Sequence, residues 1–107
     1  EIANALLVKY KNELAISVIT RIEQAVGAND KNKKRALKVI TDLFPVVSLD
    51  KRIGERALSL IELYCTPQRK LFLPDALIAA TCLENKAALL TFNIRDFKFI
   101  KGLKLAK

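Results

Sequence analysis

The hydrophobic positions of the chain alternate between two patterns, and together they predict an α/β fold. Continuous apolar runs over 14–19 and 87–91 are short and partly β-branched, which is typical of buried strands. In the segments between such runs, apolar residues recur every three or four positions, as they do on one face of a helix. Strands that alternate with helices predict a three-layer sandwich around a mostly parallel central sheet.

Turn and capping residues set the expected boundaries. A helix from Asp50 to about 64 begins at a capping aspartate, and Pro74 suits the first turn of the helix over 74–85. That last helix has almost no polar face, so we expect it to be buried. In chain order we predict a helix end over 2–12, a strand over 14–19, a helix from Thr20 to Gly27, a helix over 31–44, a strand at "VVSL", the helix from Asp50, the helix over 74–85, a strand over 87–91, a turn at "NIRDF" and an edge strand at "LKLA".

Composition indicates one compact domain spanning residues 1–107. The hydrophobic fraction of 51% with only 3 Gly and 3 Pro argues against a disordered chain. The net charge of +8 suits a polyanionic partner such as nucleic acid, or an acidic protein segment. A merely basic surface is the alternative, because charge by itself says little about function.

Several kinds of chemistry are excluded by residues that the sequence lacks. It contains no histidine, so neither a Cys/His nor a Ser/His nucleophilic dyad is available. Cys65 and Cys82 have no zinc-like spacing, and we expect buried, reduced thiols in a cytoplasmic protein. The longest apolar stretch is interrupted by Pro74 and Asp75, and there is no signal-peptide pattern, so we expect no contact with a membrane.

Three acidic residues lie at the borders of apolar segments, and each has a plain explanation. Thr20 and Glu23 form T-x-x-E, the pattern of a capping box in which Glu23 bonds back to the helix start. Asp75 stands in a first helical turn, where the helix dipole favours an acid. Asp96 follows the strand that ends at Thr91 and suits a loop or cap.

Taken together, the same three acids indicate a metal site. Each follows the carboxyl end of a strand or begins a helix, and these ends meet at one edge of an open α/β sheet, where ligands bind. Carboxylates gathered there repel one another unless a divalent cation lies between them. Oxygen ligands without His or Cys favour Mg²⁺ or Mn²⁺. A hard cation in a basic chain predicts a phosphodiester hydrolase whose metal activates water.

A basic cluster near the middle of the chain is a candidate for RNA binding. Lys31, Lys33, Lys34 and Arg35 begin the predicted helix over 31–44 and suit contacts with a phosphate backbone. The alternative is a solvated helix start, since charge runs of this kind are usually only exposed.

At these residues the sequence resembles the PIN-domain ribonucleases, and most closely the VapC-type toxins of prokaryotic toxin–antitoxin pairs. The matching pieces cover nearly the whole chain, and "PDALIAAT" followed by "LLTFNIRDF" is the most specific of them. In order, the pieces are "ISVITRIEQAVGA", "LDKRIGERALSLI", "LPDALIAATCLENKAALLTFNIRDF" and "IKGLKL". The resemblance implies a small α/β fold, a Mg²⁺- or Mn²⁺-dependent endoribonuclease site, an RNA substrate, an inhibitory antitoxin and a homodimer.

By motif, Glu23, Asp75 and Asp96 match the family's second, third and fourth acidic positions. The resemblance assigns them to catalysis and to the metal, held directly or through waters. Thr91 and Asn93 match the polar residues that accompany the last acid. Asn93 has a second explanation, because a plain turn residue serves equally well there.

One departure from the family concerns the start of the chain. Family members begin with a central strand that carries a first catalytic aspartate in a D-T-N- or D-T-S-like motif, and this sequence opens after it. We therefore expect an N-terminally truncated domain, in which the segment was lost, was never recorded or is replaced by another chain. The functional alternatives are an inactive PIN domain that binds RNA or protein, and a structural α/β protein whose acids only cap helices.

Overall fold

The computed structural model describes residues 5–9 and 13–106, in which two strands come first and pairs of helices separate the later strands. The strands are β1 (Ala5–Val8), β2 (Leu14–Ser17), β3 (Val46–Val47) and β4 (Ala88–Thr91). The helices are α1 (Val18–Gly27), α2 (Lys31–Leu43), α3 (Lys51–Tyr64) and α4 (Leu73–Glu84), followed by a single 3₁₀ turn, η2 (Ile94–Asp96). The strands form one sheet in the order β3-β2-β1-β4. The predicted α/β class is confirmed.

The first strand corrects the prediction of a helix over 2–12. Ala5–Val8 is β1, and its side chains alternate between buried and half-buried, the period of a strand. Leu7 is fully buried, with 0% of its surface exposed. The run "ALLV" is short and continuously apolar, and periodicity alone cannot separate such a run in a strand from one in a buried helix. The remainder of the predicted helix, 2–4 and 10–12, lies outside the described residues.

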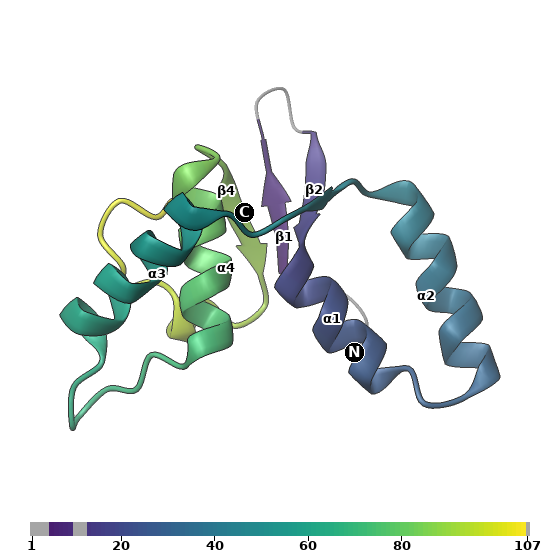
Figure 1. Cartoon of the computed structure of the whole chain (residues 1–107), viewed down its shortest axis with the longest axis horizontal. Helices are drawn as coiled ribbons and strands as arrows, with labels where there is room; N and C mark the ends of the chain where they lie inside the picture. The colour runs from purple at the N-terminus through teal and green to yellow at the C-terminus, as the bar shows by residue number, and fades with distance from the viewer. Residues whose placement is uncertain (1–4, 10–12, 107) are drawn as a thin grey trace.

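The sheet is mixed, which corrects the prediction of a mostly parallel one. β1 pairs antiparallel with β2 on one side and with β4 on the other, whereas β2 and β3 pair parallel. Because two antiparallel pairings in succession restore the original direction, β2 and β4 run the same way (Figure 1). The carboxyl ends of β2, β3 and β4 therefore share one edge of the sheet, as the sequence predicts.

Helices lie on both sides of the strands. In Figure 1, α3 and α4 lie on one side and α1 and α2 on the other. α4 supplies much of the core, because its residues are almost all apolar, as predicted. Residues 98–106 follow η2 and return to the sheet. There Leu105 forms a single parallel bridge with Leu89 of β4, in place of the predicted edge strand. No helix in the described part of the chain is long and apolar enough to span a membrane.

Two predicted helix starts are confirmed in atomic detail. The Asp30 carboxylate accepts a hydrogen bond of 2.8 Å from the backbone N–H of Lys33, which caps α2. The Asp50 carboxylate does the same for α3, accepting a bond of 2.9 Å from the N–H of Ile53. Of the two cysteines, Cys82 is buried as predicted, but Cys65 is exposed because it lies just past the end of α3.

Candidate acidic site at the carboxyl edge of the sheet

Glu23 does not belong to a capping box. α1 begins one turn earlier than predicted, with Ser17 as its N-cap, and the Ser17 hydroxyl oxygen accepts a bond of 3.1 Å from the N–H of Thr20. The Ser17 hydroxyl also donates to the Thr20 hydroxyl oxygen at 3.3 Å, and both side chains are buried. Glu23 therefore lies in the second turn of α1, where it is exposed and too far along the helix to cap it.

Asp75 stands in the first turn of α4, as predicted, but it has no part in capping. The N-cap residue is Phe72, which provides no side-chain bond, and Pro74 occupies the start of the helix. Burial, and after it the negative charges of Asp96 and Glu23, together raise the pKa of the Asp75 carboxyl to about 6. The charge on Asp75 is thus opposed by its surroundings, and the other two predicted acids are part of the cause.

Asp96 lies in η2, directly after the turn that follows β4, and its side chain is exposed. The start of this turn is held by Thr91, whose buried hydroxyl oxygen accepts a bond of 3.0 Å from the backbone N–H of Asn93. The Asn93 side chain makes no capping bond to η2 and is exposed. Thr91 therefore shapes the loop that carries Asp96, while the Asn93 amide remains available to solvent.

The topology explains how the three acids are placed. Glu23 follows β2, Asp96 follows β4, and β1 lies between these two strands. At two strand spacings, β2 and β4 are therefore about 10 Å apart. α4 contacts both α1 and β4, and Asp75 lies close enough to Asp96 and Glu23 for their charges to raise its pKa. Among residues 5–9 and 13–106, however, no three Asp, Glu or Cys side chains lie close enough to share a metal ion. The acids share one electrostatic environment without forming a closed coordination group.

The chemistry of these donors fits a hard divalent cation. All three are carboxylates, and the oxygen donors that accompany them belong to Thr91 and Asn93. A cation held between them would reverse the repulsion that raises the pKa of Asp75. Mg²⁺ and Mn²⁺ accept such ligands directly or through water, which suits acids that stand apart.

One buried polar residue next to Glu23 is not predicted from the sequence. Gln24 follows Glu23 and is 7% exposed, and neither its amide nitrogen nor its amide oxygen bonds to any group that the structure describes. A buried amide without partners is unfavourable unless another group satisfies it. It lies one turn beyond Thr20, so the signal would have been a polar residue repeated at four-residue spacing on one helix face.

The predicted RNA-binding cluster lies on a different part of the molecule. Lys31, Lys33, Lys34 and Arg35 are all exposed at the start of α2, and the Lys33 ammonium donates to the Asn29 side chain at 3.3 Å. Figure 1 shows α2 as the helix farthest from α4. The structure does not bring this cluster together with the acids, and its role in RNA binding stays a prediction.

Comparisons with known proteins agree with the fold. The family model described as the PIN domain matches residues 1–103. No curated protein matches the sequence. A chain in the toxin–antitoxin complex from Klebsiella pneumoniae is 35% identical with a TM-score of 0.69, and the match covers 83% of this chain and 70% of that one.

Two further solved structures are similar. In VapBC-1 from nontypeable Haemophilus influenzae the matched chain is 25% identical with a TM-score of 0.80, over 91% of this chain and 75% of that one. In VapBC2 from Rickettsia felis, bound to a promoter DNA fragment, the values are 24% and 0.70 over 90% and 75% of the two chains, a likeness of fold alone.

Proposed function

The chain belongs to the PIN domain family, which confirms the resemblance carried by its motifs, and on this premise we propose that it is a metal-dependent endoribonuclease of the toxin–antitoxin type. The observation that carries the proposal is the position of Asp75. Asp75 is half-buried, and its burial together with the charges of Asp96 and Glu23 raises its pKa to about 6. An ionised acid in that position is best stabilised by a cation.

In this proposal Asp75, Asp96 and Glu23 hold Mg²⁺ or Mn²⁺. When bound, the ion would act as a Lewis acid on the phosphodiester and neutralise charge that develops on it. Because Asp75 and Asp96 lie on rigid or tightly turned segments, they would fix the position of the ion. Glu23 is exposed on α1 and has a longer side chain, so it would complete the site directly or through a bound water.

The polar residues beside β4 would have supporting roles. Thr91 is buried and bonded to the backbone at Asn93, so it would hold the loop that carries Asp96 and would not touch the substrate. The exposed Asn93 amide would donate to a phosphate oxygen of the RNA or to a water beside it.

An antitoxin is the proposed inhibitory partner, since the similar structures are a toxin–antitoxin complex from Klebsiella pneumoniae and VapBC-1 from Haemophilus influenzae. The exposed apolar surface supports a protein partner. Ile22 and Val26 on α1 are 53% and 79% exposed, although four-residue spacing places them on one helix face. On α3, Leu58 and Leu63 are also largely exposed and suit the proposed homodimer.

The test is cleavage of a single-stranded RNA with Mn²⁺ or Mg²⁺ added or removed by chelation. We expect metal-dependent cleavage by the wild-type chain and its loss in Asp75→Asn. The matched control is Asp42→Asn, because Asp42 is an exposed acid on α2 that pairs with Lys38 at 3.6 Å. Equal cleavage by wild type and Asp75→Asn in the presence of metal would contradict the proposal.

A second candidate is a PIN domain that binds RNA or protein without cleaving it. Its support is that, within the part of the chain that the structure describes, no three acids lie close enough to share a metal ion. RNA binding by the wild-type chain without any metal-dependent cleavage would favour this candidate.

A further inference from the structure

The last part of the chain carries regularly spaced lysines and no acid. Lys98, Lys101 and Lys104 recur every three residues, and neither Asp nor Glu occurs between 97 and 107. All three are exposed, while Phe97 and Ile100 beside them are buried in the core. The segment thus alternates between core contacts and outward-facing cations.

This segment is fixed to the domain by backbone hydrogen bonds. The N–H of Leu89 donates to the carbonyl of Lys104 at 2.8 Å, and the N–H of Ala106 donates to the carbonyl of Leu89 at 2.8 Å. The N–H of Lys101 donates to the Tyr64 hydroxyl oxygen at 2.9 Å. The lysines are therefore presented by an ordered segment, which lowers the entropy lost when they bind a ligand.

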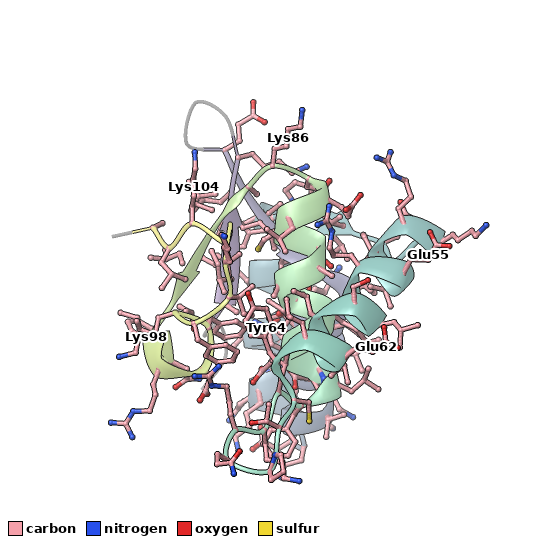
Figure 2. All side chains as sticks on the ribbon, turned by 90° about the vertical axis from the view of Figure 1, so that its left-hand side faces the viewer. Glu55, Glu62, Tyr64, Lys86, Lys98 and Lys104 are labelled. Carbon is pink, nitrogen blue, oxygen red and sulfur yellow. The ribbon has the colours of Figure 1, made fainter. Side chains whose placement is uncertain are left out.

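A fourth lysine joins them from the turn between α4 and β4. Lys86 and Lys104 line the same hollow of about 300 Å³, whose other walls are apolar or small. These walls are Cys82, Leu83, Ala87 and Gly102. We call Lys86, Lys98, Lys101 and Lys104 the C-terminal lysine strip. Figure 2 shows Lys104 and Lys98 on the left-hand side of the view and Lys86 at its top.

The strip is a concentrated and unneutralised positive charge. None of its four ammonium groups forms an ion pair with a carboxylate that the structure describes. In Figure 2 the labelled glutamates, Glu55 and Glu62, lie toward the opposite side of the view, on α3. At its other end the strip reaches the candidate site, because Lys98 follows Asp96 by two residues.

We propose that the C-terminal lysine strip binds the phosphate backbone of the RNA strand that flanks the cleaved bond. This inference rests on the proposed function, and it assigns the substrate a path from Asp96 along residues 98–104 to Lys86. Regular cations on a fixed segment match the repeating charge of a strand, and the hollow between Lys86 and Lys104 has apolar walls against which a base can pack. The basic cluster on α2 is left outside this path.

Binding of a short fluorescent single-stranded RNA, measured in EDTA at several salt concentrations, tests the proposal. The test protein is the triple variant Lys98→Gln, Lys101→Gln, Lys104→Gln. Its matched control is Lys38→Gln, Lys51→Gln, Lys70→Gln, which removes the same charge from exposed positions on α2, on α3 and before α4. Each lost phosphate contact lowers the slope of log affinity against log salt by about 0.7 for single strands, so the strip variant should lose about 2.

The expected result is a slope reduced by about 2 in the strip variant and a nearly unchanged slope in the control. Equal slopes in both variants would overturn the proposal. So would a strip variant that binds RNA as wild type does but, unlike wild type, does not bind vesicles of anionic lipid. The single variants, each expected to lose about 0.7, give the answer if the triple variant does not fold. Because no cleavage is required, a chain that binds through the strip but does not cut RNA refutes the proposed function alone.

Discussion

Replacing Asp75 by asparagine should stabilise the metal-free protein at neutral pH. The folded state raises the pKa of Asp75 from 3.8 to about 6, so ionisation is less favourable in the folded chain than in the unfolded one. Below pH 3.8 the acid is protonated in both states, and it does not oppose folding. As the pH rises through about 6, folding becomes progressively less favourable, and asparagine avoids this loss because it carries no charge.

The magnitude follows from the size of the pKa change. A shift from 3.8 to about 6 corresponds to an upper limit of ~3 kcal/mol at 1.36 kcal/mol per pKa unit. Asp75 is only half-buried, so solvent screening reduces the expected effect to about 1 kcal/mol. For a domain near this size, that corresponds to a Tm increase of about 4–8 °C in Asp75→Asn.

Thermal unfolding of both proteins in EDTA, followed by circular dichroism at neutral pH and near pH 3.5, measures the effect. We expect the variant to be more stable at neutral pH and the two proteins to converge in acid. Added Mn²⁺ should then raise the Tm of wild type but not that of Asp75→Asn, because only the folded wild type binds the ion. A variant that is less stable than wild type at neutral pH in EDTA would refute the electrostatic account of Asp75.

Three further predictions address the fold around the site. Leu7→Ala should lower the free energy of unfolding, measured with urea, by about 2–5 kcal/mol, because removing the fully buried side chain leaves a cavity in the core beneath β1. A loss below ~1 kcal/mol would argue against the buried position of Leu7 in β1. Ser17→Ala should cost about 1 kcal/mol by removing the N-cap of α1 and the bond to Thr20, whereas an unchanged urea midpoint would contradict that cap. In the native protein a thiol reagent should modify Cys65 but not Cys82, which is buried and whose pKa burial raises to about 12; equal labelling of both would show that α4 opens readily.

Helix boundaries with strong local signals could be predicted from the sequence. Asp30 and Asp50 each accept the bond from the third residue beyond them that a capping aspartate provides. The helix after Pro74 follows in the same way from a residue with a fixed φ and an apolar run. Such signals are read within a few residues, so they need no knowledge of the tertiary fold.

Features that depend on distant segments could not be predicted in this way. β1 is a strand because β2 and β4 pair with it on both sides. The residues of Ala5–Val8 do not by themselves predict those partners. T-x-x-E suggests a capping box at Thr20, but Ser17 competes for the same role and caps the helix three residues earlier. The common edge of the acids was nevertheless predicted, since it requires only that β2 and β4 run the same way, and this holds with an antiparallel strand between them.

The central claim is that Glu23, Asp75 and Asp96 bind one divalent cation, and titration of Mn²⁺ into the protein tests it most directly. Calorimetry or paramagnetic relaxation of water protons gives the number of bound ions and their affinity for wild type and for Glu23→Gln, Asp75→Asn and Asp96→Asn, with Asp42→Asn as the control. We expect wild type and Asp42→Asn each to bind one ion per chain. Each of the other three substitutions should weaken the affinity at least about tenfold, which corresponds to ~1.4 kcal/mol of binding free energy. Equal affinity in all five proteins, or no binding by wild type, would contradict the claim.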